Sequence, residues 1–322
     1  MSEIRPISLC NMVANIFGKV LPNRLRPVLM LIISETQSAF LPCRIISDNI
    51  LIAHEVPHYM NHSKNVRNNS MAIKLDMIPY NFLINGAPRG YLRPAWGIRQ
   101  GDLLLPYLFL LCVDTLTCML RAAEERGALS GIRISRESPS ISHILFADDT
   151  MIFSKAGVTE GEEVTRILRE YELASGQMIN INKCSVSFSP HTSTQLRGEI
   201  LSSSGMREVR DQGKYLGLPS QIGHSKKEVF SLMANFFSAN SEGEKGVHRK
   251  AWDSLCKDKN EGGLGFKDLE CMNLALLAKQ GWRIVTNEAS LLFKLVKGRY
   301  FKRSSFLHAK LGANPAFGWR SC

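Results

Sequence analysis

Apolar positions recur along the chain at helical spacing in four long segments. These segments cover residues 9–33, 106–121, 159–175 and 268–285. Pro22 and Pro27 fall inside the first segment and predict interruptions there. Residues 37–49 read as a loop that leads into a further helix, with Ser47 or Asp48 as its N-cap. The segment at 268–285 is the last clear helix, and the polar residues 239–245 (ANSEGEK) read as a linker before it.

Between these helices, shorter runs of apolar residues predict strands. The runs cover residues 71–77, 82–93, 141–146, 150–154, 178–189 and 215–219. Asn85-Gly86 predicts the turn of a hairpin in the second run, and residues 97–102 form a glycine-bearing polar loop. Together the elements predict an α+β fold with a small antiparallel sheet packed on helices.

Two adjacent acids stand at the centre of an apolar hairpin. In ILFADDTMIF, at residues 144–153, Asp148 and Asp149 occupy the turn between two predicted strands. Charged side chains are seldom buried unless they are paired or bound to a metal. Hard divalent cations take oxygen ligands, so the pair is a candidate metal site. The alternative is that Asp148 and Asp149 belong to an ordinary Asp-rich turn.

A third acid strengthens the metal interpretation. Asp76 ends the apolar run at 71–77, where a site at the end of a sheet would place a ligand. With Asp148 and Asp149 it would give three carboxylates for two cations, Mg²⁺ or Mn²⁺, of the kind that catalyse nucleotidyl transfer. The alternative is that Asp76 is a solvated residue at a strand end.

Charge and cysteine content narrow the class of protein. The net charge is +11 and the pI about 9.3, which suits an acidic partner such as nucleic acid or, alternatively, gives a merely basic surface. Eight cysteines form no C-x-x-C pair, so reduced thiols are expected. The start of the chain does not read as a signal peptide, and the apolar run at 103–113 is too short for a bilayer span of ~20 residues. An intracellular, soluble protein without membrane contact is predicted, and the sequence leaves its oligomeric state open.

Eleven short motifs in order make the chain resemble a known family. They are RPISLCN at 5–11, NRL at 23–25, SETQSAF at 34–40, SDNILIAHE at 47–55, MAIKLDM at 71–77, FLINGAPRG at 82–90, GIRQGDLLLPYLF at 97–109, FADD at 146–149, ASGQMIN at 174–180, KYLGLP at 214–219 and EGGLGFKDL at 261–269. FADD alone is weak, but this set in this order resembles the reverse transcriptase of plant LINE-type (non-LTR) retrotransposons.

The resemblance implies an RNA-directed DNA polymerase of right-hand architecture that takes an RNA template, a DNA primer and dNTPs. It favours the nucleus over the cytoplasm as the place of action and implies two catalytic Mg²⁺ or Mn²⁺ ions. The implied sites are Asp76, Asp148 and Asp149 for the metals; Arg44, Arg99, Gln100 and Gly101 for nucleotide and template; Tyr215, Leu216 and Gly217 for the primer grip; and Arg5 and Arg24 for the nucleic-acid backbone.

This copy departs from the family pattern at two places. After Met77 the sequence lacks the segment that forms a palm helix in the family, and near Phe230 it lacks most of the segment that forms the thumb. The resemblance thus implies a truncated, internally deleted copy with impaired activity. Its parts would be a fingers-like segment at 1–70, a palm at 71–220, and a remnant of thumb and C-terminal helices at 221–322.

Two other functions compete with an active polymerase. One is a non-catalytic retroelement remnant that binds nucleic acid through its basic surface. The other is a zinc protease, because His54-Glu55-Val56-Pro57-His58 spells H-E-x-x-H. Pro57 argues against the protease, since it would disturb the regular helix that must present both histidines on one face.

Overall fold

A five-stranded sheet forms the centre of the computed structural model. The structure describes residues 12–63, 69–77, 102–210, 213–219, 254, 256–267, 269–312 and 314–321. The strands are β1 (Ser70–Leu75), β2 (His143–Phe146), β3 (Asp149–Lys155), β4 (Ser185–Phe188) and β5 (Arg207–Glu208). Their order is β2-β3-β1-β4-β5, and a separate hairpin joins β6 (Lys214–Tyr215) to β7 (Leu218–Pro219).

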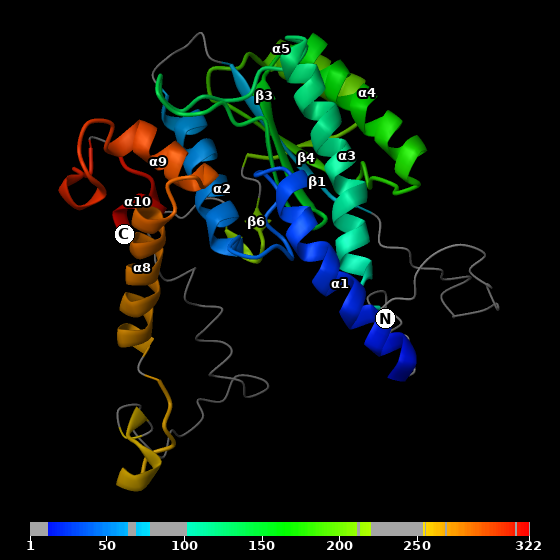
Figure 1. Ribbon diagram of the computed structural model, residues 1–322. Helices are drawn as coiled ribbons and strands as arrows, with labels where there is room; N and C mark the ends of the chain where they lie inside the picture. The colour runs from blue at the N-terminus through cyan, green and yellow to red at the C-terminus, as the bar shows by residue number, and fades with distance from the viewer. Residues whose placement is uncertain are drawn as a thin grey trace, which may run out of the picture.

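Helices cover both faces of this sheet (Figure 1). They are α1 (Met12–Ile32), α2 (Ile46–His62), α3 (Leu105–Glu125), α4 (Val158–Ser175), α5 (Thr194–Ser204), α8 (Leu269–Thr286), α9 (Leu291–Tyr300) and α10 (Phe317–Ser321). Short 3-10 turns lie at Lys259–Glu261 and Phe306–His308. Helices α3, α4 and α5 lie on one side of the sheet, and α2 and α9 lie on the other.

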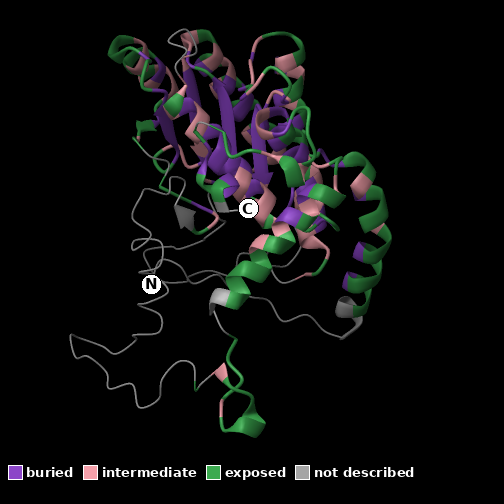
Figure 2. Ribbon diagram, turned by 90° about the vertical axis from the view of Figure 1, so that its left-hand side faces the viewer, coloured by how far each residue is buried: buried purple, intermediate pink, exposed green. Residues whose placement is uncertain are grey.

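Each face of the sheet has its own apolar core because strand residues alternate between faces. Met71, Ile73 and Leu75 of β1 join the core under α3, α4 and α5, while Ala72 joins the core under α2 and α9. Strands β1 to β4 are accordingly mostly buried, whereas β5 and much of α8 are exposed (Figure 2). Residues of α9 and Trp319 share the second core with β3, so the C-terminal helices pack directly on the sheet.

The prediction of a small sheet packed on helices is confirmed, with one correction. Strands β1, β2, β3 and β4 pair antiparallel, but β4 and β5 are parallel, so the sheet is mixed. The predicted strands at 71–77, 141–146 and 150–154 match β1, β2 and β3. The predicted hairpin at 82–93 and the predicted linker at 239–245 lie outside the described residues.

Several helix predictions were wrong in detail. Helix α1 runs through Pro22 and Pro27, and α2 runs through Pro57. A proline removes one backbone donor, and in α2 the buried turn around Pro57 keeps the helix continuous. The N-cap of α2 is Ile45, without a side-chain cap, and not Ser47 or Asp48. Helices α9 and α10 follow the segment that the sequence presented as the last helix.

Helix α3 has a composition that a membrane-spanning helix could also have. Among the described residues it is the one helix whose length and apolarity would allow it to cross a bilayer. In the structure its Leu116 and Leu120 pack under the sheet, and its Tyr107 and Leu110 pack against α1. A core helix of this kind satisfies the same criteria as a membrane span.

Candidate active site

The acidic turn joins β2 to β3 at one end of the sheet. Phe146 pairs with Asp149, so Ala147 and Asp148 form a two-residue turn. Ala147 has φ 55°, a left-handed conformation that tight hairpins require but residues with a Cβ seldom adopt. Phe146 and Ala147 pack against the core between α1 and α3, while Asp148 is exposed and Asp149 is half-buried.

Asp76 lies at the same end of the neighbouring strand. Leu75 is paired with Thr150, so the next pair in this antiparallel register is Asp76 with Asp149. The pKa of the Asp149 carboxyl is raised, first by burial and then by the negative charges of Asp148 and Asp76, while Lys74 opposes the rise. The structure therefore places the three sequence-predicted carboxylates at the same end of two paired strands, near enough for Asp148 and Asp76 to raise the pKa of Asp149.

The β6–β7 hairpin lies against this acidic end. Lys74 shares a strand face with Asp76, and its ammonium donates a hydrogen bond to the carbonyl oxygen of Lys214. Tyr215 is buried in the core under α2 and α9, and burial, followed by the charge of Asp149, raises the pKa of its hydroxyl. Leu216 and Gly217 form the turn with φ values of 50° and 82°. The residues predicted to grip the primer thus border the carboxylates.

The donor set fits a hard cation bound together with a substrate. Carboxylate oxygens are the ligands that Mg²⁺ and Mn²⁺ prefer, and a cation would relieve the repulsion that raises the pKa of Asp149. Within the described residues, no three His, Cys, Asp or Glu side chains are arranged to hold a metal ion by themselves. Phosphate oxygens and water would have to complete the coordination, as they usually do for Mg²⁺.

Arg44 points its guanidinium at main-chain carbonyls. It donates to the oxygens of Ile33 at 3.1 Å and Gln37 at 2.6 Å, and also to that of Ser34. Burial lowers the pKa of this guanidinium. In the structure Arg44 therefore fixes the loop after α1, and its role toward a triphosphate stays a prediction.

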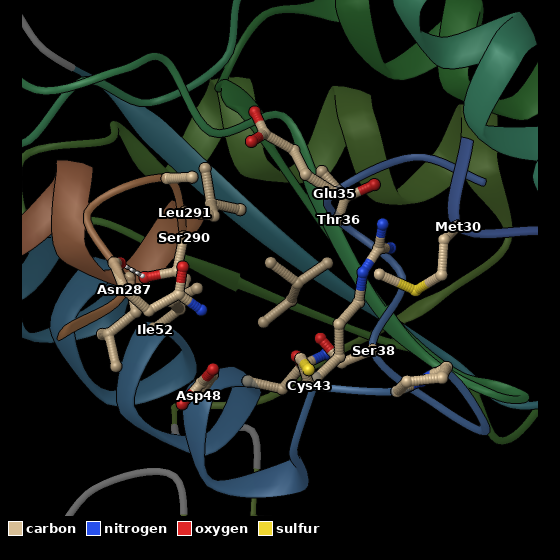
Figure 3. Close-up of a pocket in the computed structure, with 16 residues that line it drawn as sticks. Met30, Glu35, Thr36, Ser38, Cys43, Asp48, Ile52, Asn287, Ser290 and Leu291 are labelled. Atoms are coloured by element: carbon tan, nitrogen blue, oxygen red, sulfur yellow. Dashed lines mark hydrogen bonds between the residues drawn. The ribbon is translucent and has the colours of Figure 1, made fainter. Parts of the chain in front are cut away.

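Arg44 also contributes to the wall of a pocket of about 240 Å³. The pocket lies between the segment from Met30 to Ile52 and the connection of α8 to α9, as Figure 3 shows. Glu35 and Asp48 add negative charge to its wall, and Ser290 stands at the N-terminus of α9. The pocket has mixed charge, and no single ligand class follows from its lining.

The structure places only one of the remaining residues that the resemblance implies for nucleotide, template or backbone contacts. Arg24 is exposed on α1. Arg5, Arg99, Gln100 and Gly101 lie outside the described residues, as does the region after Met77 where a helix was expected to be missing. The expected gap near Phe230 also falls outside the described part of the chain. The predictions for these positions stay open.

Two buried amides at the acidic turn were not singled out from the sequence. The Oε1 of Gln37 accepts from the backbone N–H of Ala147 at 3.1 Å, and the Nδ2 of Asn49 donates to the carbonyl of Leu145 at 2.7 Å. Both residues lie within the SETQSAF and SDN motifs. The sequence feature that could have indicated them is a polar residue within a segment whose neighbouring residues are apolar and buried, because such a residue needs a hydrogen-bond partner.

The H-E-x-x-H segment has a structural partner in α9. Glu55 is only 2% exposed and pairs with Arg299, whose Nη1 lies 2.9 Å from its Oε2. The hydroxyl of Tyr300 donates to the same oxygen at 2.8 Å. His58 stacks on His62, and burial, followed by the charges of His62 and Arg299, lowers its pKa to about 4. The segment binds α9 to α2, which opposes the protease interpretation.

Comparison with known proteins identifies the class of the central segment. Residues 77–220 match the family model described as reverse transcriptase (RNA-dependent DNA polymerase), a match that covers less than half of the chain. Asp148, Asp149 and Tyr215 lie within the match, and Asp76 directly precedes it. This segment is similar in sequence to reverse transcriptases, and through it the chain resembles an RNA-directed DNA polymerase.

Two curated relatives come from Arabidopsis thaliana, and both are named uncharacterized mitochondrial proteins. The first is 58% identical over 69 residues, which cover 21% of this chain and 57% of the relative. The second is 42% identical over 96 residues, which cover 30% of this chain and 62% of the relative. The chain thus spans about three fifths of the length of each.

Proposed function

We propose that this chain is the polymerase domain of a LINE-type retroelement and extends a DNA primer on an RNA template. The observation that carries the proposal is that Asp76, Asp148 and Asp149 lie at the same end of paired strands, inside or next to the segment that matches reverse transcriptases. Carboxylates grouped among like charges are typical of sites that bind cations.

The proposed roles follow from the positions of the side chains. Asp76, Asp148 and Asp149 would hold two divalent cations, which supply charge neutralisation at the attacking and leaving oxygens. Lys74 and the β6–β7 hairpin, with Tyr215, would place the primer end beside these acids. The basic balance of +11 would favour the nucleic-acid backbone through sequence-independent contacts.

Primer extension tests this function. The assay uses a DNA primer on an RNA template with dNTPs and either Mg²⁺ or Mn²⁺. We expect slow extension, because the resemblance implies a shortened palm, and we expect Asp148→Asn and Asp149→Asn to abolish it. Asp258→Asn, at an exposed residue of the C-terminal region, is the matched control and should extend like the wild type. Extension that survives Asp149→Asn would overturn the proposed site.

A second candidate is a chain that binds nucleic acid without catalysis. The observation in its favour is that no three acids in the described region converge as a metal-holding group. Its signature would be salt-sensitive binding of an RNA–DNA hybrid with no extension under either metal. Wild-type binding with no product would favour this function over the polymerase.

For the place of action we propose the nucleus, as the resemblance implies. The two relatives named as mitochondrial proteins make mitochondria the alternative. Fractionation of plant cells that express the tagged chain distinguishes the two, because the protein should be enriched with the nuclear marker.

A further inference from the structure

The edge of β2 that faces away from β3 is covered by the segment that follows α1. Strand β2 is an outer strand of the sheet, and Gln37 forms a parallel bridge with Leu145 on that edge. The amide of Leu145 donates to the carbonyl of Thr36 at 2.9 Å, and the amide of Ser38 donates to the carbonyl of Leu145 at 3.1 Å. This backbone contact brings the side chain of Gln37 to the start of the acidic turn.

Gln37 acts on the turn through its oxygen. The residue is 1% exposed, and its Oε1 accepts from the backbone N–H of Ala39 at 2.9 Å as well as from that of Ala147 at 3.1 Å. Its Nε2 has no hydrogen-bond partner among the described residues. The acceptor is therefore the functional end of this amide, and it binds the one turn residue that has a strained positive φ.

Asn49 holds the strand that enters the turn. It is 2% exposed, lies in the first turns of α2, and donates from Nδ2 to the carbonyl of Leu145 at 2.7 Å. The two amides thus act two residues apart, one on Leu145 and one on Ala147. Both contacts are buried, where a hydrogen bond is strong and its loss leaves an unsatisfied group.

We infer that Gln37 and Asn49 are positioning residues that set the turn of Asp148 and Asp149 against Asp76; this rests on the proposed function. Asp76 has an additional anchor of its own, because its carbonyl accepts from the amide of Asn180 at 2.7 Å. The carboxylates therefore stand on two paired strands, and each strand end has its own further contact. A shift of one support relative to the other would misplace the metal ligands by a fraction of an ångström and slow the chemistry.

The first part of the test is a set of kinetic measurements on primer extension. Gln37→Met keeps the volume and removes the acceptor, and we expect kcat to fall by roughly 100-fold while KM for the primer–template stays unchanged. Asn49→Asp loses the donor and should resemble Gln37→Met, and it takes the place of that variant if Gln37→Met does not fold.

Gln177→Met is the matched control. Gln177 also accepts a hydrogen bond through its side chain, from the hydroxyl of Tyr171 at 3.0 Å, but just after the end of α4 and not from a residue of the acidic turn. It should leave kcat unchanged. An equal loss of kcat in Gln177→Met and Gln37→Met would overturn the inference.

Hydrogen–deuterium exchange of residues 143–152 separates this inference from the proposed function. We expect faster exchange in Gln37→Met than in the wild type, with no change in Gln177→Met, whether or not the protein extends primers. If the wild type extends no primer but Gln37→Met still exchanges faster than the wild type, the positioning contact is supported and the polymerase function is ruled out. Unchanged exchange in Gln37→Met would overturn the inference even if the wild type is active.

Discussion

Glu55 and Asp149 are both carboxylates withdrawn from water, but their neighbours carry opposite charge. Glu55 faces Arg299 at 2.9 Å and the hydroxyl of Tyr300 at 2.8 Å. Asp149 faces Asp148 and Asp76, with Lys74 as the opposing charge. Burial is the largest cause of the raised pKa at both acids, and the neighbours then lower it at Glu55 and mostly raise it further at Asp149.

The difference separates a structural acid from a candidate ligand. A buried carboxylate with its own arginine is already neutralised, and its pair connects two helices. A carboxylate among like charges is incomplete until a cation arrives, which is typical of functional sites. Pro57 already made the zinc-protease interpretation of HEVPH the weaker one in the sequence, and the charged neighbours of Glu55 and Asp149 now distinguish HEVPH from FADD.

The largest expected effect is the loss of the counter-charge at Glu55. Arg299→Met leaves Glu55 buried and unpaired, and we expect the free energy of unfolding to fall by about 3–5 kcal/mol, measured by urea denaturation. Lys302→Met is the control, because Lys302 forms a long, exposed pair of 3.9 Å with Glu137 and should change little. Equal effects in the two variants would show that the Glu55 pair does not hold α9 on α2.

The next effect is the pH dependence of the free energy of unfolding that comes from His143, a buried base rather than a buried acid. Burial lowers the pKa of His143 to about 3, below its ordinary 6.5, so the folded state binds fewer protons than the unfolded state. The free energy of unfolding should therefore fall as pH drops from about 6.5 toward 3. Urea denaturation at pH 7 and pH 5 should show a smaller loss in His143→Gln. A slope unchanged by this substitution would contradict the assignment.

A smaller effect is expected at Lys74, which competes with any cation for Asp149. Lys74→Met should tighten Mn²⁺ binding by about tenfold, or ~1.4 kcal/mol, in a calorimetric titration. It should also raise KM for the primer–template, because the contact with Lys214 is lost. Lys74→Arg keeps the charge and is the control. Weaker Mn²⁺ binding in Lys74→Met would mean that the ammonium does not oppose the metal.

The smallest effect is on stability at the acidic turn. Asp149→Asn removes one of the facing like charges, and we expect the free energy of unfolding to rise by about 1 kcal/mol at neutral pH. Glu55→Gln should change it in the opposite direction, because it leaves Arg299 without its counter-charge. A destabilised Asp149→Asn protein would show that the carboxylate is already compensated.

Local pattern was sufficient to predict the elements that surround the site. Short runs of apolar residues predicted β1 and the β2–β3 hairpin, and helical spacing predicted α3, α4 and α8. The placement of Asp76 at a strand end also followed from letters alone. Pro57 led to the wrong prediction of a disturbed helix. The packing of α2 against α9 and the sheet keeps the helix continuous, and this packing cannot be predicted from neighbouring residues in the sequence.

Contacts between distant segments could not be predicted. Gln37 meets Ala147 across 110 residues, and Arg299 meets Glu55 across 244. The insertion of β1 between β3 and β4 depends on the same kind of long-range pairing. A propensity or a period describes neighbours in sequence, so it carries no information about which distant partner satisfies a buried polar group.

The most direct test of the central claim is the anomalous scattering of Mn²⁺ in crystals of the protein with primer–template and a non-hydrolysable dNTP. We expect two manganese peaks about 4 Å apart, bound by Asp76 together with Asp148 or Asp149 and by phosphate oxygens. Peaks elsewhere, or no manganese at these three carboxylates, would contradict the account.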